Sequence, residues 1–131
     1  MIILDTCILI YDALSPHKLS AKANKAIQVG YEKKKLCCCD ISLWEIAMLV
    51  TKGRIEPGVD IQAFLRLILQ ARQLEILNIT VEIAALSTTY PSYKHFDPAD
   101  RLIAATAMHY KADLVSCDKK LHEIPALSVV W

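Results

Sequence analysis

Four carboxylates of this chain stand where they can act on one bound group: Asp5, Glu45, Asp100 and Asp118. Asp5 and Asp118 each follow a short apolar run that is typical of a buried strand, whereas Glu45 and Asp100 fall near the starts of predicted helices. In a parallel α/β sheet, the carboxyl ends of the strands and the N-termini of the helices share one edge. The pattern therefore predicts that all four side chains converge on that edge.

A cluster of this kind must take up protons or bind a cation. Like charges about 4 Å apart repel by about 4 kcal/mol per pair at an effective dielectric constant of about 20. Oxygen ligands without a Cys/His set favour Mg²⁺ or Mn²⁺ over Zn²⁺. Such an ion lowers the pKa of an attacking water and stabilises the charge that builds on a phosphate. The predicted chemistry is hydrolysis of a phosphodiester.

Each acid also has a local explanation. Ser42 and Glu45 have the spacing of a capping box, and Asp5 and Asp118 are suited to cap the ends of strands. Asp97 directly precedes Pro98, which predicts that Asp97 is a helix N-cap and that Asp100 lies in the first turn of that helix. A local role explains each motif singly, but four acids at one edge favour a shared site.

The elements that would position these acids alternate between strands and helices. Strands are expected over residues 1–4, 36–41, 74–79, 112–117 and 128–131, helices over 6–14, 18–34, 42–53, 60–72, 81–89 and 98–110, a half-turn over 121–124 and a loop over 91–94. This alternation predicts an α/β fold, a three-layer sandwich around a central, mostly parallel sheet of about five strands.

Length and composition fit a single domain over residues 1–131. With 54% hydrophobic and 22% charged residues, the chain is globular, and a net charge of +1 excludes a strongly basic nucleic-acid surface. We expect a cytoplasmic protein without a signal peptide or a membrane span.

The five cysteines suit neither a disulfide framework nor a zinc knuckle, because their number is odd and three are consecutive. We expect small buried side chains in a reducing cytoplasm. Cys7 and Cys117 each adjoin a proposed site carboxylate, whose charge would raise the thiol pKa, so neither is expected to be a nucleophile.

Four segments resemble the PIN domain in order and spacing: Leu4-Asp5-Thr6, residues 42–47, residues 97–105 and Ser116-Cys117-Asp118. The resemblance is greatest to the VapC-type toxins of toxin–antitoxin pairs, and it covers essentially the whole chain. It implies a metal-dependent endoribonuclease that uses Mg²⁺ or Mn²⁺, cleaves RNA, forms a homodimer and is neutralised by an antitoxin protein.

By this resemblance, the four acids named at the outset are the catalytic, metal-binding quartet. Thr6 would support them, Asp97 would cap its helix, and Arg101 would contact a phosphate or a partner if it is not simply exposed. The family often has an aromatic residue where this chain has Ala99, and a threonine where it has Ser116. Serine keeps the hydroxyl group, so neither departure removes a ligand.

Two other functions stay open at this point. One is a non-catalytic RNA- or protein-binding module on the same fold, in which the acids are structural. The other is a Mg²⁺-dependent phosphatase, which is disfavoured because Cys7 stands where an Asp-x-Asp motif would need a second acid. Trp44 and the helix over 60–72 suggest a partner groove or dimer face as well as core packing, and Asp12 is expected to be a solvated surface charge.

Overall fold

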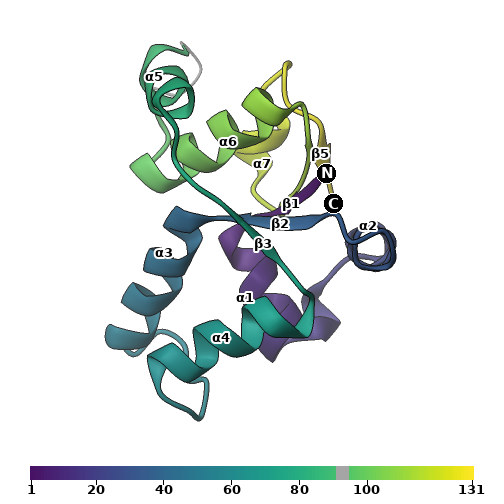
Figure 1. Cartoon of the computed structure of the whole chain (residues 1–131), viewed down its shortest axis with the longest axis vertical. Coiled ribbons are helices and arrows are strands. Elements are labelled where there is room, and N and C mark those ends of the chain that lie inside the picture. Colours follow the sequence, from purple (N-terminus) through teal and green to yellow (C-terminus); the bar gives the residue numbers. More distant parts are fainter. Residues whose placement is uncertain (91–94) are drawn as a thin grey trace.

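The computed structural model of this protein describes residues 1–90 and 95–131, so the loop expected over 91–94 lies outside the described residues. Its five strands form one sheet in the order β3-β2-β1-β4-β5, and every neighbouring pair is parallel (Figure 1). The strands are β1 (Ile2–Leu4), β2 (Leu36–Cys39), β3 (Glu75–Leu77), β4 (Asp113–Val115) and β5 (Val129–Val130). The predicted sheet of about five, mostly parallel strands is confirmed.

Helices cover both faces of this sheet. They are α1 (Thr6–Leu14), the 3₁₀ helix η1 (Pro16–Lys18), α2 (Ala21–Glu32), α3 (Asp40–Thr51), α4 (Ile61–Ala71), α5 (Val81–Thr89), α6 (Pro98–Tyr110) and α7 (Lys119–His122). Helices α1 to α4 lie on one face, α6 and α7 lie on the other, and α5 packs on the outside of α6 (Figure 1). The chain is a three-layer α/β sandwich, as predicted. None of the described helices is both long and apolar enough to cross a membrane.

The strands are apolar apart from the exposed first residues of β3 and β4, Glu75 and Asp113, because both faces of the sheet are covered. Alternate side chains of a strand point to opposite faces. On β1, Ile3 packs with α6 and α7 whereas Leu4 packs with α1 to α4, and both are fully buried. Two hydrophobic cores, one on each side of the sheet, hold the layers together.

The strand order reverses between β1 and β4, which are hydrogen-bonded neighbours in the middle of the sheet. The chain moves outward from β1 through β2 to β3, and then starts again on the other side of β1 with β4 and β5. Crossover connections leave this point open at the carboxyl edge of the sheet, which is where α/β proteins bind ligands. The first and fourth strands are thus adjacent, which brings the residues that follow them, Asp5 and Asp118, to the same place.

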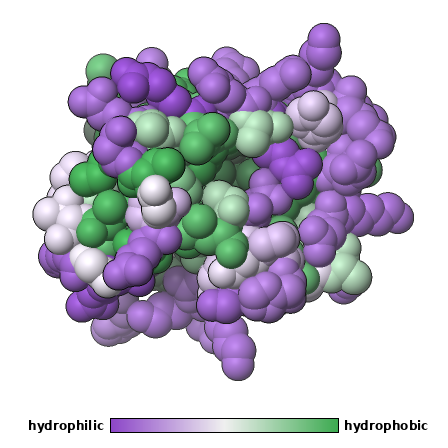
Figure 2. All heavy atoms as spheres, turned by 90° about the horizontal axis from the view of Figure 1, so that it is seen from below, coloured by the Kyte–Doolittle hydropathy of each residue, from purple (hydrophilic) through white to green (hydrophobic). Residues whose placement is uncertain are grey.

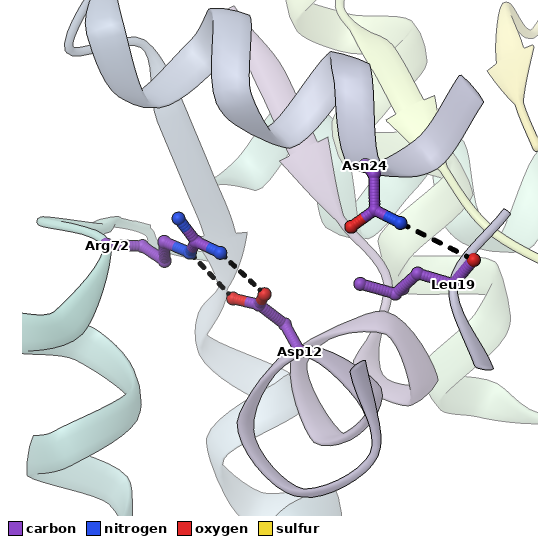
Figure 3. Close-up of polar contacts among 4 residues, drawn as sticks. All are labelled: Asp12, Leu19, Asn24 and Arg72. Carbon is purple, nitrogen blue, oxygen red and sulfur yellow. Dashed lines mark hydrogen bonds and ion pairs between the residues drawn. The ribbon is translucent and has the colours of Figure 1, made fainter. Parts of the chain in front are cut away.

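An ion pair joins α1 to the end of α4. Arg72 donates from Nε and from a terminal guanidinium nitrogen to the two oxygens of Asp12, at 2.8 Å each (Figure 3). The guanidinium group also lies over the ring of Tyr31, 5.8 Å from its centroid. The expectation that Asp12 is a solvated surface charge is therefore wrong. Its partner lies sixty residues further along the chain and could not be identified from local sequence.

Candidate active site

All four predicted acids line one cavity of about 220 Å³ at the carboxyl edge of the sheet, together with Thr6. Asp5 follows β1, Asp118 lies three residues beyond β4, and Glu45 and Asp100 project from the N-terminal halves of their helices. Five polar side chains from four separate parts of the sequence thus meet beside the point where the strand order reverses.

Asp5 is the most enclosed acid, with a relative exposure of only 5%. Its Oδ1 accepts the N–H of Thr6 at 2.7 Å and so caps α1, and its Oδ2 accepts a hydrogen bond from Ser116 Oγ at 2.6 Å. Burial raises the pKa of Asp5, and these two hydrogen bonds offset part of the shift. Hydrogen bonds from Thr6 and Ser116 therefore fix the orientation of the Asp5 carboxylate.

Ser116 links two of the acids. Its hydroxyl donates to Asp5 and accepts the backbone N–H of Asp118 at 3.1 Å, and the serine itself is fully buried. Asp118 in turn caps α7 by accepting the N–H of Lys120 at 2.9 Å. One serine thereby sets the position of Asp5 relative to the loop that carries Asp118.

Thr6, which also contacts Ser42, holds the side chain of Glu45 on α3. Thr6 Oγ1 donates to Glu45 Oε1 at 2.5 Å and lies 2.9 Å from Ser42 Oγ. The predicted capping box of Ser42 and Glu45 is wrong: α3 begins at Asp40, because β2 ends at Cys39 and the chain turns directly into the helix. Glu45 therefore lies more than one turn into α3, and burial raises the pKa of its carboxyl group.

Asp100 is positioned as predicted. Asp97 is the N-cap of α6 and accepts the N–H of Asp100 at 2.9 Å, with Pro98 in the first helical position. Burial, and after it the charges of Asp97, Asp5, Asp118 and Glu45, raises the pKa of Asp100 to about 7. The cavity therefore disfavours the ionised form of this acid.

These side chains suit a hard divalent cation by their chemistry, because the donors are carboxylate oxygens and each charge raises the free energy of the others. Within residues 1–90 and 95–131, no three His, Cys, Asp or Glu side chains stand close enough together to surround an ion in this conformation. Several of the carboxylate oxygens are instead held by the hydrogen bonds described above. A cation would relieve the repulsion that raises the pKa of Asp100.

Some of the sequence predictions lie outside the cavity, and two contacts were missed. Arg101 does not line the cavity; its Nε donates to the carbonyl oxygen of Phe96 at 3.0 Å and so ties α6 to the preceding loop. His122 Nε2 lies 2.9 Å from the carbonyl oxygen of Ser116, and Cys7 Sγ lies 3.3 Å from Cys117 Sγ. The cysteine contact depends on the pairing of β1 with β4, and the His122 contact depends on the turn into α7. Neither contact can be predicted from a local sequence motif.

The protein is thus an α/β sandwich whose carboxylate-lined cavity lies where the strand order reverses, the usual ligand position in such folds. The family model described as "PIN domain" matches residues 2–127. The chain also shows 33% identity to Ribonuclease VapC22 of Mycobacterium tuberculosis, over 99% of this chain and 98% of that protein. The chain therefore belongs to the PIN domain family.

Solved structures share the fold over nearly the whole length. The chain is similar to VapBC2 from Rickettsia felis, solved bound to a promoter DNA fragment, with a TM-score of 0.72, 23% identity and coverage of 98% and 97% of the two chains. DNA-bound VapBC from Salmonella typhimurium gives a TM-score of 0.70 at 16% identity, covering 98% of this chain and 95% of that one. At these identities the likeness extends to the fold alone.

Proposed function

We propose that this protein is a metal-dependent endoribonuclease that hydrolyses RNA phosphodiester bonds and acts as the toxin of a type II toxin–antitoxin pair. The observation that carries the proposal is the convergence of Asp5, Glu45, Asp100 and Asp118 on one cavity at the switch point of the sheet. Membership of the PIN domain family and the similarity to a ribonuclease of Mycobacterium tuberculosis support the same activity.

In this proposal the four carboxylates hold Mg²⁺ or Mn²⁺, which would supply an activated water and a positive charge beside the scissile phosphate. The residues of the chain do the positioning. Ser116 and Thr6 orient Asp5 and Glu45 by their hydroxyl groups, and Asp97 fixes the first turn of α6 so that Asp100 faces the cavity. The apolar side chains of Ile10 and Leu49 line the same cavity and limit its access to bulk water.

Substrate binding must draw on local positive charge, because the net charge is only +1. Lys119 and Lys120 directly follow Asp118 and are exposed, so they are the residues best placed to contact the phosphates on either side of the cleaved bond. None of these lysines lines the acidic cavity itself, nor do Arg54 and the basic run 33–35, but Lys119 and Lys120 are adjacent in sequence to one of its acids.

The toxin assignment also requires a protein partner, and one face of the molecule suits it. A cavity of about 420 Å³ opens between α1 and α4, with Leu9, Phe64 and Ile68 among its apolar lining residues. Figure 2, which views the molecule from below the orientation of Figure 1, shows apolar side chains gathered around a hollow on this face. We propose that an antitoxin covers this cavity, so that the helix over 60–72 forms part of a partner groove. We also propose that the protein forms a homodimer and is located in the cytoplasm.

The test is RNA cleavage by purified protein with Mn²⁺, with excess chelator, and with the variant Asp100→Asn. We expect cleavage that needs the metal and that falls by roughly 10²-fold or more in the variant, since one ligand and its charge are lost. Asp60→Asn is the control, because it neutralises an exposed carboxylate at the start of another helix, α4, that lies away from the cavity. Full activity of Asp100→Asn, or cleavage in chelator, would overturn the proposal.

The two alternative functions give different results in the same experiment. A small-molecule phosphatase would hydrolyse a chromogenic phosphomonoester and leave RNA intact. A non-catalytic module would bind RNA or protein with the same affinity in the wild type and in Asp100→Asn. It would hydrolyse neither RNA nor the phosphomonoester.

A further inference from the structure

Two cysteines meet beside the acidic cavity. Cys7 lies in the first turn of α1 and Cys117 lies in the segment between β4 and α7, and their sulfur atoms are 3.3 Å apart although the residues are 110 positions apart in sequence. Both are half-buried free thiols. Cys7 lines the acidic cavity, and Cys117 is partly exposed beside it.

The other three cysteines have no comparable arrangement. Cys37, Cys38 and Cys39 are consecutive on β2 and are almost fully buried, with relative exposures of 2%, 0% and 2%. Cys37 and Cys39 pack on one face of the sheet, whereas Cys38 packs on the other, so neighbours point apart. Residues two apart on one face of a strand are separated by about 6.6 Å or more along it, at or beyond the usual limit for a disulfide.

We propose that Cys7 and Cys117 are a redox modification site, at which a peroxide joins the two thiols in a reversible disulfide beside the acidic cavity. Burial and the charge of Asp5 raise the pKa of Cys7, so Cys117 is the thiol that, contrary to the expectation from sequence, reduces hydrogen peroxide, becomes a sulfenic acid and releases water. The second thiol then attacks the sulfenic sulfur, the S–O bond breaks, and the hydroxide leaves as a second water with the remaining thiol proton. Two thiols and one peroxide thus give one disulfide and two waters.

The bond would act on the residues next to it. A disulfide brings its sulfur atoms to about 2.05 Å, so the segments that carry Cys7 and Cys117 must approach by about 1 Å. Asp5 precedes Cys7 by two residues and accepts its weak S–H hydrogen bond at 3.8 Å, and Asp118 directly follows Cys117. Oxidation therefore removes a donor to Asp5 and fixes the spacing of two of the four acids. This consequence for catalysis rests on the proposed function, whereas the formation of the bond does not.

The bond itself is tested by counting thiols. Reduced full-length protein in chelator is exposed to hydrogen peroxide, then unfolded and alkylated, and the alkyl groups are counted by mass spectrometry. Of the five free cysteines, we expect three to be alkylated, a mass loss of about 2 Da before alkylation, and a cross-linked peptide that contains Cys7 and Cys117. Dithiothreitol should restore five alkylated cysteines.

Two variants make the count specific. Cys117→Ser should keep all four remaining thiols under the same exposure, and Cys37→Ala, the control at a buried cysteine, should still form the bond. The proposal is overturned if the wild type keeps five thiols, if the cross-link joins another pair or two molecules, or if Cys117→Ser loses thiols as readily as the wild type.

RNA cleavage then tests the consequence for the site. We expect the oxidised protein to cleave RNA about 10-fold or more slowly than the reduced protein, because a displacement of about 1 Å misaligns a catalytic group. Reduction should restore the rate, and Cys117→Ser should be active and insensitive to peroxide, since Cys117 does not line the cavity. An oxidised protein with full activity would contradict the link to the acids. A reduced protein without any cleavage would contradict the proposed nuclease, while the thiol count would still decide the disulfide.

Discussion

Helix α1 has an acid at each end of its length, and the two are treated in opposite ways. Asp12, near the C-terminal end, is paired through both oxygens with Arg72, which spans the gap to α4 (Figure 3). Asp5, the N-cap, is buried beside Glu45, Asp100 and Asp118, and among residues 1–90 and 95–131 its side-chain oxygens accept hydrogen bonds only from uncharged groups.

This contrast separates a compensated charge from an uncompensated one. In the ion pair, the guanidinium group of Arg72 compensates the partly buried carboxylate of Asp12. Burial raises the pKa of Asp5, Glu45 and Asp100, so their ionised forms are unfavourable in the cavity. In the proposed function, a cation from solution would compensate them.

The largest effect should separate the two acids by activity. Asp5→Asn should lower the rate of RNA cleavage by roughly 10²-fold or more, since a ligand charge at the switch point is lost. Asp12→Asn, the same change two turns along α1, should leave the rate per folded molecule unchanged. Equal rates for the two variants in a Mn²⁺ cleavage assay would remove the distinction.

A smaller loss of activity is expected from Ser116→Ala, which removes the hydroxyl that orients Asp5 and receives the N–H of Asp118. Groups that orient metal ligands change affinity or activity by about 10- to 100-fold. Ser87→Ala is the control, because Ser87 is also buried but its hydroxyl donates to a carbonyl oxygen of its own helix, that of Ala84. Similar cleavage rates for these two variants would show that Ser116 has no positioning role.

Stability should respond at the opposite end of α1. Arg72→Met leaves Asp12 without its partner and should lower the free energy of unfolding by about 2 kcal/mol, measured by urea denaturation. Arg66→Met, on the exposed side of the same helix, should change it by less than about 0.5 kcal/mol. A loss of the same size in both variants would mean that the ion pair contributes nothing specific.

The smallest effect concerns pH in the absence of metal. The pKa of Asp100 is raised in the folded state, so the folded protein binds this proton more tightly than the unfolded chain, and stability is lost as pH rises from about 4 to 7. Asp100→Asn removes this loss. In chelator, its stability relative to the wild type should increase by about 1 kcal/mol between pH 5 and pH 8, after allowance for the partial exposure of the group. A pH-independent difference in thermal unfolding would contradict the shift.

The sequence was sufficient for the architecture and for the acids that meet in one cavity. Apolar strands bounded by acids and the Asp-Pro-x-Asp start of α6 are local signals, and they located the C-terminal end of β1 and the N-cap at Asp97 correctly. The convergence of the acids also depends on β1 and β4 being neighbours, which the sequence could not show and the structure does.

Contacts between distant segments could not be predicted in this way. The Asp12–Arg72 pair and the Cys7–Cys117 contact depend on how α1 packs against α4 and on the register of β1 with β4. The expectation that all the cysteines are small buried residues holds for Cys37 to Cys39 but is wrong for the other two, which are half-buried and in contact. The start of α3 was placed too late because Ser42 and Glu45 matched a capping motif. Both side chains instead lie within hydrogen-bonding distance of the Thr6 hydroxyl group.

Titration calorimetry with Mn²⁺ tests most directly whether the acidic cavity is a cation site. The wild type should give a saturable isotherm, and both Asp5→Asn and Asp100→Asn should weaken it by at least about 10-fold, whereas Asp12→Asn should leave it unchanged. The contrary result is the absence of binding to the wild type, or the same isotherm in the Asp5→Asn and Asp100→Asn variants.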